Sequence, residues 1–100
     1  MSQEGTIHVI ALFVAAPGKE DELERVLTEL IEPTRREAGC IRYELVRGLG
    51  RSAEFAFVEE WESVATLDAH AVSAHLKAMQ AKVPGLLAAP ASVERYRLVK

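Results

Sequence analysis

The segment Glu54–Glu62, with the sequence EFAFVEEWE, decides how this 100-residue chain folds. Its aromatic residues recur at every second position, which is the period of a β-strand and places them on one face. A second strand-like run, Ile41–Arg47, precedes it, and the glycine-containing stretch between the two runs is typical of a turn. The two runs therefore predict a β-hairpin. Ser63 follows directly and is a good N-cap for a helix.

The elements on either side of this hairpin follow from the same periodicities. Residues 6–15 predict a strand with apolar side chains on both faces. Apolar residues at three- and four-residue steps then predict a helix from about residue 20, with a kink or restart at Pro33 and an end at Gly39. Beyond Ser63 we expect a helical stretch that carries His70, then a further one over residues 72–83. Ser92–Val99 predicts the last strand.

The resulting order is β-α-β-β-α-β, which indicates an α+β protein with the ferredoxin-like split βαβ arrangement and an antiparallel sheet. We expect residues 1–100 to form a single domain. Both helical regions of this arrangement cover the same face of the sheet, yet the first strand is apolar on both faces. A second copy of the chain would cover the other face, so the pattern predicts a homodimer formed through the sheet face.

Composition narrows the class of protein further. A net charge of −3 argues against a nucleic-acid partner, which would favour a concentrated basic surface. We expect no signal peptide, because the N-terminus has neither a basic start nor an apolar run, and no membrane partner, because no apolar stretch is long enough to cross a bilayer. The single cysteine, Cys40, cannot form an internal disulfide. These observations predict a cytoplasmic protein.

His70 is the first candidate for catalysis, because an imidazole near the sheet can take a proton from an acidic C–H or O–H group at neutral pH. The alternative is a histidine at the edge of the core that only bonds a backbone carbonyl. His75 lies five residues on, about 140° away around a continuous helix, so the two imidazoles converge only if the helix breaks near Ala71–Ser73. That spacing is wrong for a pair of metal ligands and no third ligand is evident, so we expect no metal site.

The hairpin supplies three more candidates. Glu59 shares a face with the aromatic residues, which predicts a raised pKa and a role as an acid or as a partner of a histidine; alternatively it reaches solvent or pairs with an arginine. Trp61 would stack on a flat aromatic ligand or fill the core. Tyr43, expected to face outward from the neighbouring strand, would donate a hydrogen bond to a ligand or to the protein itself.

A series of short motifs, taken in order and spacing over roughly residues 7–98, resembles the antibiotic biosynthesis monooxygenase (ABM) domain family, and within it the small quinol-monooxygenase-like branch. The motifs are Pro17-Gly18-Lys19, Glu32-Pro33-Thr34-Arg35, Gly39-Cys40-Ile41-Arg42-Tyr43, Phe57-Val58-Glu59-Glu60-Trp61-Glu62-Ser63, Leu67-Asp68-Ala69-His70 and Ser73-Ala74-His75.

The resemblance implies a dimeric α+β barrel with a hydrophobic pocket between the helices and the sheet of each subunit. It also implies oxidation of a small quinol or phenol with O2 and without metal or flavin, so we expect no cofactor. By this similarity we expect His70 to be the base or the hydrogen-bond partner of the substrate oxygen. Tyr43, Trp61 and Phe57 form the pocket wall that binds the substrate, and Glu59 and His75 support the catalysis.

The chain departs from some members of this family because it contains no asparagine. Haem-degrading members use an asparagine, so haem degradation is not expected, and polyketide-oxidising members also rely on one. Two other functions stay open on the same fold. One is an isomerase or processing enzyme for a small carbonyl signal molecule, which would use the same imidazole without O2. The other is a dimeric stress-response module that binds a small molecule without chemistry.

Overall fold

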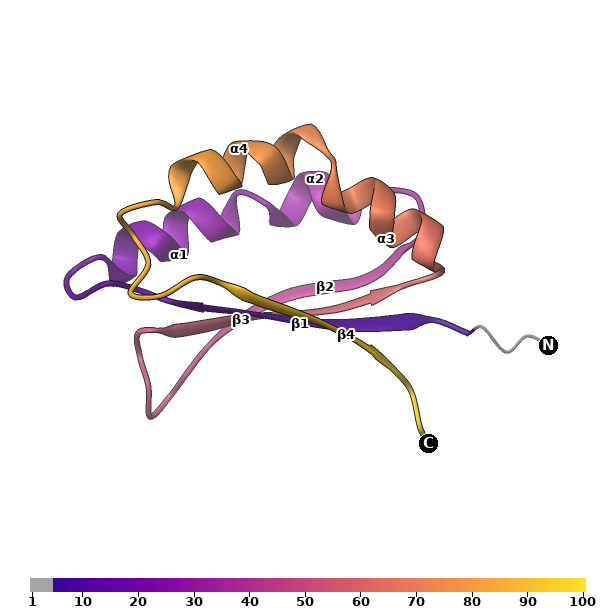
Figure 1. Cartoon of the computed structure of the whole chain (residues 1–100), viewed down its shortest axis with the longest axis horizontal. Helices are drawn as coiled ribbons and strands as arrows, with labels where there is room; N and C mark the ends of the chain where they lie inside the picture. The colour runs from indigo at the N-terminus through magenta and orange to yellow at the C-terminus, as the bar shows by residue number, and fades with distance from the viewer. Residues whose placement is uncertain (1–4) are drawn as a thin grey trace.

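The computed structural model describes residues 5–100 and shows a helical layer packed on one face of a four-stranded sheet (Figure 1). Residues 1–4, which belong to the segment where no signal peptide is expected, lie outside the described residues. The elements in chain order are β1 (Ile7–Val14), α1 (Glu20–Thr28), α2 (Ile31–Arg35), β2 (Cys40–Arg47), β3 (Glu54–Trp61), α3 (Val64–Ala71), α4 (Ala74–Lys82) and β4 (Ser92–Arg97).

The sheet has the strand order β2-β3-β1-β4, and every neighbouring pair is antiparallel. Ala11 of β1 lies opposite Phe57 of β3, and Tyr43 of β2 lies opposite Glu59. This order is that of the ferredoxin-like split βαβ arrangement. It confirms the predicted α+β fold, including the hairpin of β2 and β3.

The first helical region is divided by Pro33. A proline ring clashes with the carbonyl group four residues earlier, so a helix cannot run through it unbroken. Here that carbonyl belongs to Glu29, the C-cap of α1, and Pro33 lies in the first turn of α2, where its missing N–H is tolerated. The restart expected at Pro33 is therefore present, and its break lies a few residues before the proline.

The second helical region is also divided, because two serines each begin a helix. Ser63 and Thr66 form a capping box at the start of α3, in which the Thr66 backbone N–H donates to Ser63 Oγ at 3.1 Å. Ser73 begins α4 in the same manner, since its Oγ accepts from the Leu76 backbone N–H at 3.3 Å. The chain therefore changes direction between Ala71 and Ala74, and this places His70 and His75 near the ends of two different helices.

The strand boundaries differ from the predicted ones at several points. β1 is one residue shorter at each end than the expected 6–15. β3 ends at Trp61 instead of Glu62, and β4 ends at Arg97 instead of Val99. The register shifts between Cys40 and Arg42, which is an irregularity of the β-bulge type. Strict alternation along the run Ile41–Arg47 predicts that Ile41, Tyr43 and Leu45 share one side. Because of the bulge Ile41 is instead 49% exposed while Tyr43 is buried, so this expectation is wrong for Ile41.

The two faces of the sheet are both apolar, but only one is covered. The face below the helices carries the large buried aromatic residues of β3, and the core continues into α1 and α3 through Leu23, Leu27 and Leu67. The opposite face exposes apolar side chains of β1, β2 and β4, namely Ile10, Leu12, Val14, Val46 and Tyr96. No helix within residues 5–100 has both the length and the apolar character needed to cross a bilayer.

Candidate functional site

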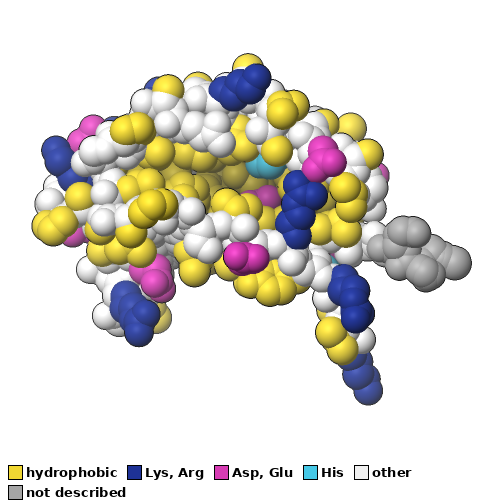
Figure 2. Space-filling model, viewed as in Figure 1, with side chains coloured by type: hydrophobic (Ala, Val, Ile, Leu, Met, Phe, Trp, Pro, Cys, Tyr) yellow, Lys and Arg dark blue, Asp and Glu magenta, His cyan; other side chains and the backbone are white. Residues whose placement is uncertain are grey.

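A cavity of about 290 Å³ lies between the helical layer and the sheet. Its walls come from all four strands, α3 and α4 and are mostly apolar. Figure 2 shows this hollow with hydrophobic side chains around it and an imidazole and an acidic side chain in its depth. The histidine and the acid that line the cavity are His70 and Glu59. These two polar groups therefore converge in a chamber whose walls are mostly apolar, which is the usual make-up of a small-molecule site.

His70 is held in the floor of this cavity by aromatic neighbours and by a carboxylate. Its ring lies 4.7 Å from the Trp61 ring and 5.6 Å from the Tyr43 ring, measured between centroids. Its Nδ1 lies 2.8 Å from Oε2 of Glu37, which comes from the loop between α2 and β2. The imidazole is 5% exposed, so this buried polar group is satisfied by a side-chain partner.

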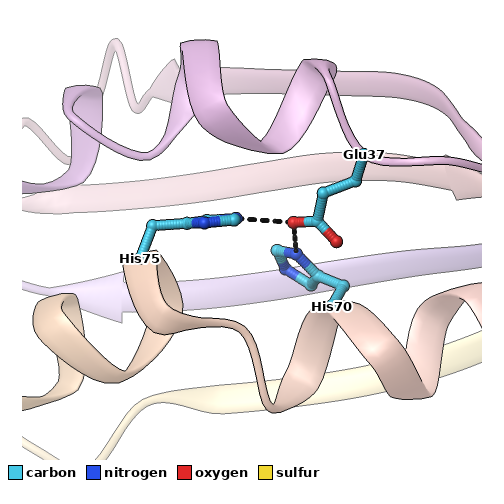
Figure 3. A group of neighbouring side chains, drawn as sticks. All are labelled: Glu37, His70 and His75. Carbon is cyan, nitrogen blue, oxygen red and sulfur yellow. Dashed lines mark hydrogen bonds and ion pairs between the residues drawn. The ribbon is translucent and has the colours of Figure 1, made fainter.

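His75 reaches the same oxygen atom from the start of α4. Its Nε2 lies 2.5 Å from Glu37 Oε2, and the two imidazole rings are 6.1 Å apart (Figure 3). The convergence depends on the break between α3 and α4, because residues five apart on one helix would point in different directions. The three side chains form a cluster that we call the Glu37–His70–His75 triad.

Sequence reasoning did not find Glu37. It lies in the mixed-charge run Arg35-Arg36-Glu37, which is typical of a solvated surface, and it is more than thirty residues from either histidine. The topology gives the only usable signal, because the fold places the ends of the two helical regions side by side (Figure 1). An acidic residue two positions before the helix-ending Gly39 would then face the second helical region.

Gly39 fixes the position of this loop. Its φ of +85° is one that residues with a side chain rarely adopt, and a Cβ at this position would lie 2.4 Å from Cβ of Thr66. The chain thus passes against the first turn of α3, two residues beyond Glu37. Because Thr66 belongs to the capping box of α3, the loop that carries Glu37 and the helix that carries His70 are in direct contact.

The contact with Glu37 determines which ring nitrogen of His70 carries the proton and which is left for the cavity. A carboxylate can only accept hydrogen bonds, so Nδ1 of His70 carries the proton and donates it to Glu37. The second nitrogen, Nε2, then bears a lone pair, and within residues 5–100 it has no hydrogen-bond partner. An imidazole held in this tautomer can accept a proton from a molecule bound in the cavity.

Glu59 is the second polar group of the cavity and is satisfied by Trp61. The indole N–H donates to Glu59 Oε1 at 2.9 Å. Burial raises the pKa of Glu59 to about 7, and the charge of Glu37 adds to this rise while the hydrogen bond from Trp61 opposes it. This confirms the raised pKa expected from the aromatic surroundings. Near neutral pH the carboxyl group exists in both forms, so it can either donate to or accept from a ligand.

The aromatic candidates divide into two groups. Tyr43 and Phe57 line the cavity and stack on each other with ring centroids 4.7 Å apart. Tyr43 is buried on the helix-covered face, so the expectation that it faces outward was wrong. Burial, together with the negative charge of Glu59, holds the pKa of Tyr43 well above its ordinary value, so the phenol stays a hydrogen-bond donor. Trp61 is fully buried and supports Glu59 and His70 from behind.

Of the six residues singled out from the sequence, the structure places His70, Glu59, Tyr43 and Phe57 at the cavity. His75 belongs to the triad without lining the cavity, and Trp61 belongs to the core cluster. No metal site is expected from two histidines five residues apart on one helix without a third ligand. In the structure the helix breaks between them, and Glu37 joins the two histidines.

Comparison with known proteins agrees with the geometry. The sequence model of the antibiotic biosynthesis monooxygenase family, ABM, matches residues 6–82 of this chain. The chain belongs to this family. An ABM protein from Bacillus subtilis, named "Putative monooxygenase YcnE", is 32% identical over 82 residues, which cover 82% of this chain and 86% of that protein.

Two further relatives show how far the similarity extends. "Uncharacterized protein sll1783" of Synechocystis is 33% identical over 84 residues, or 84% of this chain, and the chain spans 57% of that protein's length. The solved structure of Rv0793 from Mycobacterium tuberculosis has a TM-score of 0.89 at 32% identity and covers 95% of this chain and 96% of that one. The ABM fold is therefore shared over nearly the whole chain.

Proposed function

We propose that this ABM protein is a cofactor-independent monooxygenase that oxidises a small quinol or phenol with O2 and uses His70 as the base. The observation that carries this proposal is the orientation of His70. Its Nδ1 is fixed by Glu37, while the ring lines an apolar cavity with Nε2 unpartnered among the described residues. A positioned base next to a mostly apolar chamber suits the deprotonation of a phenol.

In the proposed reaction the substrate supplies all the electrons. One quinol and one O2 give one hydroxyquinone and one water, so one oxygen atom enters the ring and the other leaves as water with two hydrogen atoms of the quinol. The protein must remove the hydroxyl proton, because the resulting anion gives up electrons to O2 more readily than the neutral quinol does. His70 Nε2 takes that proton, and the imidazolium formed is stabilised by Glu37 behind it.

The remaining groups of the cavity suit a flat substrate with more than one oxygen. The Tyr43 hydroxyl is a donor, and Glu59 donates or accepts according to pH. The Phe57 ring offers a stacking surface. At the rim Arg95, which also lines the cavity, pairs with Asp68 at 2.8 Å. These groups support a small aromatic substrate with hydroxyl groups at both ends.

We further propose that two copies associate through the face of the sheet that the helices leave uncovered, which we call the bare face. The support is the exposed apolar set on that face, which includes Ile10, Leu12 and Val14. Monomers rarely leave a continuous apolar patch of this kind in water.

The single thiol, Cys40, fits a reducing compartment, which supports a cytoplasmic protein.

The test is oxygen consumption by purified protein that has been stripped of metal and flavin, with a panel of quinols and anthrone-like phenols. We expect uptake above the autoxidation rate, reduced at least about 100-fold in His70→Ala because a positioned base contributes about that much. His8→Ala is the matched control, since His8 lies on β1 and contacts Thr6 instead of the triad.

The same experiment distinguishes the alternatives. Proton exchange on a hydroxyketone without oxygen uptake, lost in His70→Ala, would identify an isomerase. Ligand binding without turnover would identify a binding module. Oxygen uptake that does not respond to His70→Ala would contradict the role of His70 as the base.

A further inference from the structure

We propose that Glu37, His70 and His75 bind a divalent first-row transition-metal ion of the Zn²⁺ type, one per chain. The three ligand atoms, one carboxylate oxygen and two imidazole nitrogens, all lie within 4.8 Å of one another. They come from three separate elements, the loop after α2, the end of α3 and the start of α4 (Figure 3). This inference does not rest on the proposed monooxygenase function.

The donor set points to this class of cation. Two imidazoles with one carboxylate form the ligand set of many zinc and non-haem iron sites, in which the other coordination positions stay open. Calcium and magnesium prefer oxygen ligands only, so the two nitrogens disfavour them. Zn²⁺, Co²⁺, Ni²⁺ and Fe²⁺ all accept this donor set, and divalent copper binds such sites more tightly still.

The separations of the three ligand atoms suit a bound cation once the side chains rotate. A cation with ligands at about 2.1 Å would hold them about 3.0–3.4 Å apart in octahedral or tetrahedral geometry. Glu37 Oε2 now lies 2.8 Å from His70 Nδ1 and 2.5 Å from His75 Nε2, because the oxygen occupies the place between the two nitrogens. A cation would replace the shared hydrogen bonds, so the oxygen would retreat by less than about 1 Å. The three ligand atoms lie within 4.8 Å of one another, so the two nitrogens would also approach each other, by up to about 1.8 Å. Rotations of the Glu37 and His75 side chains would supply these movements.

The triad is accessible from solvent, and neighbouring residues hold its side chains in place. The side chain of His75 is 25% exposed and that of Glu37 is 16% exposed, so an ion can enter from solvent. His70 is supported by the Trp61 ring, and the loop of Glu37 is fixed by the contact of Gly39 with Thr66. Ligands held in place before the ion arrives lose little conformational freedom on binding.

A bound cation would change what His70 offers to the cavity. Without metal, Nδ1 carries the proton and Nε2 is an acceptor. With the cation on Nδ1, the proton of the neutral ring must sit on Nε2, which then becomes a donor. The cation and a base at Nε2 therefore exclude one another, so metal content would decide the chemistry available at the floor of the cavity.

The test is calorimetric titration of untagged, chelator-treated protein with ZnCl2, followed by the visible absorption of the Co²⁺ complex. We expect one equivalent of Zn²⁺ per chain, with the d–d bands of a low-coordinate Co²⁺ site. Glu37→Gln, His70→Ala and His75→Ala should each weaken binding by at least about tenfold, since each removes one of only three protein ligands. Glu37→Gln keeps the size and an acceptor oxygen, so it remains informative if a histidine variant fails to fold.

Two control variants make the assignment specific. His8→Ala removes an imidazole outside the triad, and Cys40→Ser removes the single thiol, whose pKa is raised by burial and by the nearby Glu37 charge. Both should bind Zn²⁺ as the unmodified chain does. Absence of saturable binding, binding unchanged in Glu37→Gln and His75→Ala, or binding lost in either control would each overturn the proposal. Because no readout depends on turnover, failure here is distinct from failure of the proposed oxidation.

Discussion

The two faces of the sheet are made from the same strands and both carry apolar residues, yet they differ in the surroundings of their polar groups. On the helix-covered face the two buried titratable side chains of the cavity, Glu59 and His70, each have a fixed partner: Glu59 accepts from Trp61, and His70 donates to Glu37. On the bare face the polar groups are surface charges such as the pair of Arg42 and Glu44, whose side chains are about half exposed.

This difference separates the face of the sheet that positions reactive groups from the face that is available to another surface. Burial makes a polar partner necessary, and the partner in turn fixes the orientation and the protonation of the group. The bare face has no such constraint, and its apolar side chains are available to another surface. We therefore expect substitutions on the covered face to change stability and pH dependence, and those on the bare face to change association.

The largest effect should come from Trp61→Ala. The indole is fully buried and supports both Glu59 and His70, so its removal leaves a cavity and an unpartnered carboxyl group. We expect a loss of about 3–5 kcal/mol in the free energy of unfolding, measured with urea. Val46→Ala on the bare face is the control and should cost less than about 1 kcal/mol. Equal losses in the two variants would contradict the contrast between the faces.

The next effect is a change in how stability depends on pH, caused by Glu59. Its pKa in the folded state is about 7, above that of an exposed glutamate, so the folded chain binds more protons than the unfolded chain between about pH 4.5 and 7. Stability contributed by this group is therefore present at low pH and is lost as the pH rises through 7.

Glu59→Gln should remove that dependence and gain up to about 3 kcal/mol relative to the unmodified chain when the pH is raised from about 4.5 to 8. Glutamine retains an oxygen that can accept from Trp61, so the comparison isolates the charge. The measurement is a series of urea denaturations across this pH range. Parallel curves for the two proteins would show that the carboxyl group titrates like an exposed one.

Much of the fold could be predicted from sequence because its signals are local. Alternation identified the strands, and Pro33 and Ser63 marked helix boundaries. Ile41 was misplaced because a bulge depends on the partner strand, and Tyr43 was misplaced because alternation gives two faces without saying which is covered. Glu37 was missed for a stronger reason: a charged residue in a loop acquires its role only from residues that lie far away in sequence.

A smaller effect on stability, but a clear one on association, is expected for Leu12→Glu. Leu12 is exposed on the bare face, so the charge should leave the free energy of unfolding of the monomer within about 1 kcal/mol. It should also separate the proposed dimer, which sedimentation velocity would report as a shift to the mass of one chain. An unchanged sedimentation coefficient alongside a dimeric parent would place the interface elsewhere.

The smallest effect should follow Arg42→Ala, which removes the surface pair with Glu44. Exposed pairs contribute little because water and salt screen them, so we expect a change of less than about 0.5 kcal/mol in thermal or urea unfolding. A loss above about 1 kcal/mol would show that this part of the bare face is covered in solution, as it would be inside an interface.

The close approach of Gly39 to Thr66 has a consequence for anyone who wishes to redesign this protein. The loop at Gly39 and the helix cap at Thr66 pack so closely that neither can be changed without the other, although the whole β2–β3 hairpin separates them in sequence. A saturation library would find Gly39 as intolerant as a buried aromatic residue. A transplant of the imidazole pair into another scaffold would have to carry both segments together, because neither alone encodes the geometry.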